Sequence, residues 1–227
     1  MKVLLIHGLG RSPLSVFGLS QFLQLEGYQT ALFGYSSLIE PYTQIIERLQ
    51  DRLLELEAEP YAIIAHSLGA VLVRSALTTK PKLTPNPIIL LGPPNQSPRI
   101  AQLARRLSPF SFIAGECFQN LADPNFFRQL PPLSQKHIII AGTGGPRAPW
   151  RFFGEEINDG VLTLQEMQVQ ECEVFQSVTP STTKGCLKLL LPVQHTQMLN
   201  HGLVQRAIMD ILSGSNPRAS SETPALP

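Results

Sequence analysis

Ser67 lies in surroundings that are typical of a nucleophilic serine. The segment Ala65-His66-Ser67-Leu68-Gly69 joins the end of an apolar run to the start of a segment with helical periodicity. A sharp turn between a strand and a helix lifts a serine hydroxyl above the edge of a sheet, provided that the residues two before and two after the serine are small. Ala65 and Gly69 meet this requirement. The pattern therefore predicts Ser67 as a nucleophile for acyl transfer.

A histidine is needed beside such a serine, because the hydroxyl is a poor nucleophile until a base removes its proton. Downstream of Ser67 the chain has His137, His195 and His201. His137 begins a predicted core strand, and for His201 we expect a surface or packing role. His195 follows the last predicted strand and precedes the last predicted helix, so it emerges at the carboxyl edge of the sheet. We predict His195 as the base.

A carboxylate must in turn orient the histidine and stabilise the imidazolium that forms. Asp159 stands in a polar loop after the strand predicted at 137–141, and the order Ser, Asp, His along the chain matches the arrangement that accompanies a strand-to-helix elbow. Asp123 is a rival, although its Ala-Asp-Pro-Asn setting is typical of a helix start or a turn. Glu156 is a weaker rival. We predict Asp159 as the acid.

Main-chain amides near Ser67 could hold the negative charge of a tetrahedral intermediate. The helix that begins at Leu68 directs unpaired amides and the positive end of its dipole at the space above Ser67. The first strand ends in His7-Gly8-Leu9-Gly10, where glycines allow close approach to a substrate. We predict the amides of Leu9 and Leu68 as the oxyanion hole. We interpret His7 as a structural hydrogen-bonding residue and His66 as a packing or loop-supporting residue.

The elements that must position these groups can be predicted from hydrophobic patterns. Short apolar runs bounded by Gly or Pro indicate strands buried on both faces, at 2–6, 29–33, 62–65, 88–91, 137–141 and 187–191. Between them, apolar residues recur at helical spacing, as in Ile45, Leu49, Leu53 and Leu56, and again in Val204, Ile208, Ile211 and Leu212. Alternating strands and helices predict an α/β fold with a doubly wound, mostly parallel sheet.

Two regions depart from this alternation. Residues 92–133 are rich in Pro and Phe and predict an insertion with short helices at most, which could form a cap or lid over the site. Its aromatic rings would line an acyl pocket or pack the insertion itself; they are Phe110, Phe112, Phe118, Phe126 and Phe127. Residues 214–227 lack an apolar period and predict a disordered tail. We therefore expect one domain over 1–213.

Composition excludes several classes of partner. A length of 227 residues with 43% apolar residues suits a single domain, and a formal net charge of +1 without a Lys or Arg cluster argues against nucleic acid as a partner.

Three widely spaced cysteines, Cys117, Cys172 and Cys186, predict reduced packing residues. The first apolar run is too short for a signal peptide or a membrane span, so we expect a cytoplasmic protein without a transmembrane segment.

Taken together, the His7-Gly8-Leu9-Gly10 loop, the elbow at Ser67, the Asn158-Asp159-Gly160-Val161 loop and the segment His195-Thr196-Gln197-Met198-Leu199 resemble lipase-like α/β-hydrolases. The resemblance spans nearly the whole chain up to Leu212. It implies a Ser-Asp-His triad, ester hydrolysis through an acyl-enzyme, no metal or other cofactor, and often a lid. The implied substrate is a small-molecule or lipid ester, with transient contact to a membrane surface.

The chain also departs from that family in two respects. Its elbow begins with Ala65 rather than Gly, and the chain opens directly on the strand that carries the His7-Gly8 loop, so we expect a minimal version without the two leading antiparallel strands. The same triad would serve an acyltransferase or a thioesterase, and the same fold could be a catalytically silent binding protein. These alternatives stay open at the level of sequence.

Overall fold

The protein is built around one sheet of parallel strands. The computed structural model describes residues 1–107, 115–168, 172–174 and 185–214. Its strands are β1 (Lys2–Ile6), β2 (Gln29–Phe33), β3 (Tyr61–His66), β4 (Ile88–Leu91), β5 (His137–Gly142), β6 (Glu173–Val174) and β7 (Cys186–Leu191). They lie in the order β2-β1-β3-β4-β5-β7-β6, and the strand pairs of the described chain are parallel. The predicted doubly wound parallel sheet is confirmed.

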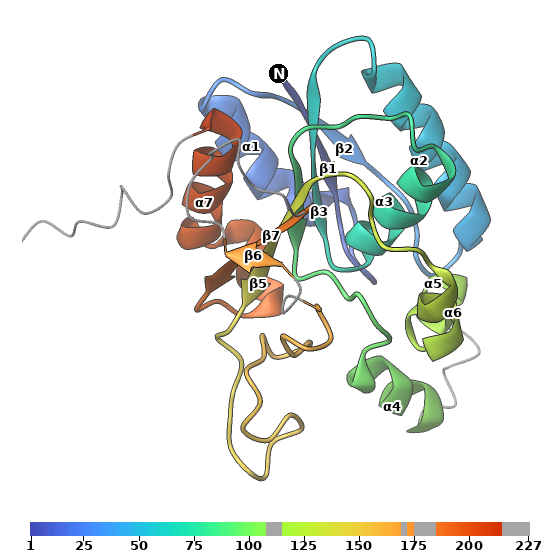
Figure 1. Cartoon of the computed structure of the whole chain (residues 1–227), viewed down its shortest axis with the longest axis vertical. Coiled ribbons are helices and arrows are strands. Elements are labelled where there is room, and N and C mark those ends of the chain that lie inside the picture. The colour runs from blue at the N-terminus through green and yellow to red at the C-terminus, as the bar shows by residue number, and fades with distance from the viewer. Residues whose placement is uncertain (108–114, 169–171, 175–184, 215–227) are drawn as a thin grey trace, which may run out of the picture.

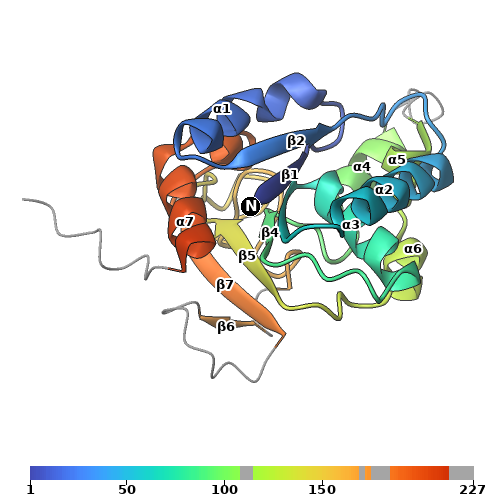
Figure 2. The same ribbon diagram turned by 90° about the horizontal axis from the view of Figure 1, so that it is seen from above.

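Helices cover both faces of this sheet, as Figures 1 and 2 show. The helices are α1 (Phe17–Leu25), α2 (Tyr42–Leu56), α3 (Leu68–Thr79), α4 (Arg99–Leu107), α5 (Gly115–Leu121), α6 (Pro124–Gln129) and α7 (Gly202–Ser213). Helices α1 and α7 pack on one face, and α2 and α3 pack on the other. The periodic apolar residues that predicted α2 are all buried.

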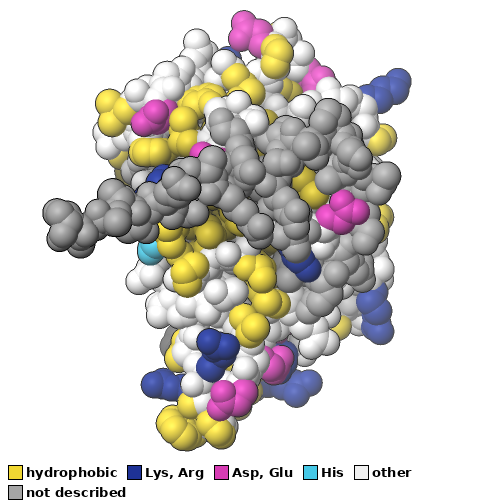
Figure 3. Space-filling view, turned by 60° about the vertical axis from the view of Figure 1, so that its left-hand side comes forward, with side chains coloured by type: hydrophobic (Ala, Val, Ile, Leu, Met, Phe, Trp, Pro, Cys, Tyr) yellow, Lys and Arg dark blue, Asp and Glu magenta, His cyan; other side chains and the backbone are white. Residues whose placement is uncertain are grey.

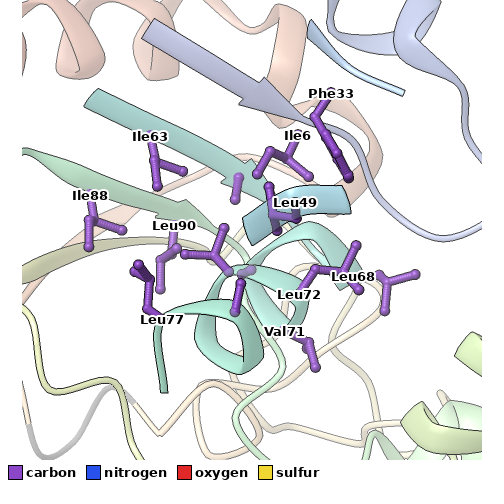
Figure 4. Close-up of a cluster of buried hydrophobic side chains, with 14 of the residues drawn as sticks. Ile6, Phe33, Leu49, Ile63, Leu68, Val71, Leu72, Leu77, Ile88 and Leu90 are labelled. Carbon is purple, nitrogen blue, oxygen red and sulfur yellow. The ribbon is translucent and has the colours of Figure 1, made fainter. Parts of the chain in front are cut away.

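Alternate residues of the central strands enter two separate cores, because successive side chains of a strand point to opposite faces. In β1, Leu4 and Ile6 belong to the core beneath α2 and α3, whereas Val3 and Leu5 belong to the core beneath α1 and α7. Figure 4 shows the first of these cores, with side chains of the strands packed against those of α2 and α3. The resulting double-sided burial fixes the carboxyl ends of the strands, which carry the site.

Not every strand is buried on both faces, and the prediction was wrong in this respect for β2 and β7. Both strands are mostly half-buried, whereas β3 and β4 are buried throughout. The reason is position, because β2 lies at one edge of the sheet and β7 is flanked by the two-residue strand β6. Strand β6 was not predicted, because two residues are too few to show a periodic pattern.

Two of the three cysteines form a disulfide, so the prediction of three reduced cysteines was wrong. Cys172 is bonded to Cys186 across a Cα–Cα distance of 4.8 Å. The pair meets because β6, which begins at Glu173, lies parallel to β7 with Glu173 opposite Leu187. Fourteen positions separate the two cysteines, and that spacing alone gave no sign of the contact. Cys117 is a free and buried thiol, as predicted for a packing residue.

The insertion and the tail are described only in part. Helices α4, α5 and α6 all lie between β4 and β5, and the segments after β4 and β5 extend from the same end of the sheet (Figure 1). Phe110 and Phe112 lie outside the described residues. Helix α7 ends at Ser213, and the next residue, Gly214, caps it in the left-handed conformation with a φ of 73°. The predicted tail beyond it lies outside the described residues. Among the helices that the structure describes, none combines the length and the apolar character that a membrane span requires.

Candidate active site

Ser67 occupies a strained turn between β3 and α3. Its φ of 53° and ψ of −120° are unusual for a residue with a side chain, and such a conformation costs about 1–3 kcal/mol. The surrounding structure holds it in place: the Ser67 N–H donates to the Leu91 carbonyl over 3.0 Å, and the Ser67 carbonyl accepts from the Ala70 N–H over 2.9 Å. The elbow that the sequence predicts at Ser67 is therefore present in the structure.

Gly69 is required at this elbow because of the main chain at the end of β1. A Cβ atom at position 69 would lie 2.7 Å from the His7 carbonyl oxygen and 2.9 Å from the Ile6 carbonyl oxygen. Both distances are shorter than those at which real Cβ atoms contact other atoms. Close packing of α3 on β1 is what demands glycine here.

His195 and Asp159 form a buried acid–base pair. The Nδ1 atom of His195 lies 2.7 Å from Oδ2 of Asp159, and the His195 N–H donates to the Asp159 carbonyl over 2.8 Å. The other carboxylate oxygen, Oδ1, accepts from the N–H groups of Val161 and Leu162 over 2.9 and 2.7 Å. Since a carboxylate can only accept, Nδ1 of His195 carries a proton, and Nε2 of the neutral ring is free to act as a base.

Ser67 and His195 line the same cavity, which has a volume of about 340 Å³. Within the described chain no hydrogen bond joins the Ser67 hydroxyl to His195. The predicted acid and base are thus in hydrogen-bond contact, whereas the predicted nucleophile lines the same cavity as the base without a hydrogen bond to it.

The rival residues have structural partners instead. Asp123 caps α6 by accepting from the Asn125 N–H over 2.9 Å, as its sequence setting indicated. Glu156 pairs with Arg99 over 2.8 Å. His201 caps α7 through the Leu203 N–H, and the Nδ1 atom of His137 donates to the Gln135 carbonyl. The described lining of the cavity includes none of these four side chains.

The loop after β1 is held in a defined orientation beside Ser67. Nδ1 of His7 donates to the Gly8 carbonyl over 3.0 Å, and the Tyr35 hydroxyl donates to the His7 carbonyl over 2.7 Å. Because a trans peptide points its carbonyl and its N–H in opposite directions, the first bond also orients the Leu9 N–H. Leu9 lines the cavity, and Leu68 begins α3. Of the two predicted oxyanion donors, Leu9 thus lies in the loop after β1, and Leu68 lies in the first turn of α3, directly after Ser67.

Glu166 is a buried residue of this region that sequence reasoning missed. Its Oε2 accepts from the Thr163 N–H over 2.8 Å, and its Oε1 accepts from the Arg99 N–H over 2.6 Å. Glu166 therefore ties the start of α4 to the loop that follows Asp159. The signal in the sequence was the spacing Thr163-x-x-Glu166, which is typical of a capping box.

The cavity is mainly apolar. Its lining comes from the β1 loop, the elbow, the insertion, the acid loop and the base loop, and consists of Gly8, Leu9, Arg11, His66, Ser67, Pro94, Pro98, Ile100, Ala101, Ala104, Phe118, Leu121, Val161, Leu162, His195 and Thr196. Of the predicted aromatic rings, Phe118 reaches this cavity, whereas Phe126 packs against Tyr42 and Phe127. Across the described residues, no group of three or more His, Cys, Asp or Glu side chains could hold a metal ion.

Burial of His66 predicts a loss of stability in acid. Burial is the main cause that lowers the pKa of His66 from 6.5 to about 3. Below pH 6.5 the His66 imidazole therefore binds a proton in the unfolded chain but not in the folded chain. The free energy of unfolding consequently falls as the pH falls. At pH 5 this histidine alone costs about 2 kcal/mol relative to pH 7.5. Denaturant unfolding at both pH values measures the loss, and His66→Gln is expected to reduce it by that amount. An unchanged pH dependence in the variant would contradict a buried neutral imidazole.

Comparison with known proteins finds solved structures that share the fold at low sequence identity. No family model and no curated protein sequence matches the chain. The mature lipase BlEst2 of Bacillus licheniformis superposes with a TM-score of 0.70 at 18% identity, over 93% of this chain and 91% of that one. A monoacylglycerol lipase of Paleococcus ferrophilus gives 0.62 at 14% identity, over 94% and 95%. The thioesterase domain from the curacin biosynthetic pathway gives 0.57 at 14% identity, over 93% and 90%.

Proposed function

This chain has the α/β-hydrolase fold, and from that premise we propose that it is a serine hydrolase that cleaves carboxylic esters through an acyl-enzyme on Ser67. The observation that carries the proposal is the buried bond between His195 Nδ1 and Asp159 Oδ2 at the wall of a cavity shared with Ser67. A bond of this kind holds the imidazole with Nε2 unprotonated, which is the state that a general base requires.

The proposed reaction begins when Nε2 of His195 takes the proton of Ser67 and the serine oxygen attacks the ester carbonyl. The amides of Leu9 and Leu68 stabilise the oxyanion. His195 then gives its proton to the departing alcohol, and water, activated by the same imidazole, releases the acid and restores Ser67. The serine hydroxyl must turn toward His195 for the first step. Such bonds often tighten only when substrate is bound.

The substrate class follows from the cavity. Its walls are formed chiefly by Leu, Ile, Val, Pro, Ala and Phe side chains, and an apolar acyl group would replace water there favourably. We therefore propose an ester with an apolar acyl chain, from a lipid or a small molecule. Hydrolysis of p-nitrophenyl esters of increasing chain length tests this, with a fluorophosphonate probe to detect a reactive serine. No hydrolysis and no adduct on the folded protein would favour a catalytically silent binding protein.

A thioesterase or an acyltransferase would use the same residues. The structural similarity to a thioesterase domain favours testing this alternative directly. Product analysis distinguishes it, because a competing alcohol or thiol captures the acyl group in a transferase, and a thioester is consumed faster than the matching oxygen ester in a thioesterase.

Helix α4 supports transient contact with a lipid surface. Ala101 is its one buried residue, and its apolar stripe is exposed, at 38% for Ile100, 39% for Leu103 and 72% for Leu107. The helix also carries Arg105 and Arg106 without any acidic residue. Figure 3 shows the molecule from another side, where apolar side chains at the lower end lie next to both basic and acidic ones. Such a helix suits the surface of an anionic membrane.

Replacement of Leu107 by Asp is expected to weaken binding to phosphatidylglycerol vesicles about tenfold or more, since burial of a leucine contributes about 1.5–3 kcal/mol. Co-sedimentation with vesicles measures it. Leu25→Asp is the matched control, because Leu25 is an exposed leucine on α1. Equal binding of both variants would show that α4 does not touch the lipid.

A further inference from the structure

His66, the residue before the proposed nucleophile, contacts the main chain of the proposed base. Its Nε2 atom lies 3.1 Å from the His195 carbonyl oxygen, across 129 positions of sequence. The two rings are also neighbours, with centroids 4.7 Å apart and planes inclined by 45°. His66 is buried. The elbow of Ser67 and the loop of His195 are therefore joined by a buried hydrogen bond.

The chemistry of that bond fixes the protonation of His66. A carbonyl oxygen can only accept, so Nε2 donates and carries the proton. Nδ1 of the neutral ring is then a lone pair, and it is buried without a hydrogen-bond partner in the described chain. It faces Gly8, where an added Cβ would lie 3.0 Å from it. The ring thus fills the space between the oxyanion loop and the base loop.

A charged form of His66 would disturb catalysis, and the site prevents it. Burial is the main cause that lowers the pKa of His66, and the adjacent His195 lowers it further. His66 therefore stays neutral when His195 becomes an imidazolium during the reaction. Because Nδ1 has no hydrogen-bond partner among the described residues, the hydrogen bond that orients the ring is the one from Nε2 to the His195 carbonyl.

We propose that His66 is a positioning residue, whose Nε2–H holds the His195 carbonyl and so sets the distance from the His195 imidazole to Ser67. The inference rests on the proposed function. Among the described residues, Asp159 accepts from the N–H and the Nδ1–H of His195, and His66 donates to the His195 carbonyl. The bonds to Asp159 join His195 to the acid loop, whereas the bond from His66 joins it to the elbow that carries Ser67. General-base catalysis is sensitive to displacements of about 1 Å.

A matched pair of substitutions separates positioning from packing. In His66→Gln the side-chain amide can donate from about the place of Nε2, whereas His66→Met has a similar length and no donor. We expect His66→Met to lower kcat between 10- and 100-fold with KM within twofold, and to slow fluorophosphonate labelling by the same factor. His66→Gln is expected to recover kcat to within threefold of the wild type. His66→Asn, whose amide lies near the place of Nδ1, is expected to behave as His66→Met does.

The experiment needs two internal checks. The end point of fluorophosphonate labelling gives the fraction of folded enzyme, so that rates are compared per active site and a loss of folding does not count as a loss of rate. Equal rates in the Met and Gln variants, whether both fast or both slow, would overturn the positioning role. If the wild-type protein itself reacts with neither probe nor ester, the proposed function fails instead, and the two outcomes are distinct.

Discussion

Ser67→Ala is expected to lower the turnover of a p-nitrophenyl ester by a factor on the order of 10⁶. The proposed acyl-enzyme cannot form without the serine oxygen. Initial rates at saturating ester measure the effect, together with fluorophosphonate labelling, which is expected to disappear.

The matched control for this change is Ser134→Ala, at an exposed serine whose hydroxyl contacts the neighbouring Gln135. It is expected to retain full activity and labelling. Persistent ester hydrolysis in the Ser67 variant, at a rate within tenfold of the wild type, would place the nucleophile elsewhere. Far-UV circular dichroism and the melting temperature of each variant establish that the comparison is between folded proteins.

Asp159→Asn is expected to lower turnover roughly 10⁴-fold while leaving the fold intact. The contacts of the carboxylate explain why. Oδ1 accepts from two main-chain N–H groups, of Val161 and Leu162, so the carbonyl oxygen of an asparagine would remain there. Its NH₂ group would then face Nδ1 of His195. That imidazole would be forced to carry its proton on Nε2, where it cannot accept the proton of Ser67. The pH dependence of kcat measures the change.

Asp123→Asn provides the control, because asparagine caps a helix about as well as aspartate does and Asp123 caps α6. This variant is expected to keep its activity. If instead Asp159→Asn were fully active and Asp123→Asn inactive, the acid would have been assigned to the wrong loop.

The centre of the fold was predictable from the sequence because its strands are short, apolar and bounded by Gly or Pro. The edges were not. Half-buried strands such as β2 and β7 contain the same residue types as buried ones, so composition alone does not separate them. Strand β6 consists of two residues that pair with β7 at the edge of the sheet. Its existence depends on a tertiary contact that leaves no local pattern.

The candidate site was predictable to a similar degree. Ser67, Asp159 and His195 follow different strands, and parallel strands bring their carboxyl ends to one edge of a sheet, so order along the chain was informative. The supporting contacts were not deducible. The partner of His66 lies far away in sequence, and Glu166 contacts Arg99 across the insertion. These hydrogen bonds depend on how the loops fold back onto the sheet, and the hydrophobic periodicity of the sequence carries no information about that.

The bond between Cys172 and Cys186 bears on how the protein is best produced. Disulfides form and persist in oxidising compartments and are rare in the reducing cytosol. Expression in an ordinary bacterial cytosol would then yield the dithiol form, which is heavier than the disulfide form by two hydrogen atoms. Secretion into the periplasm is accordingly the expression route that matches the covalent structure described above.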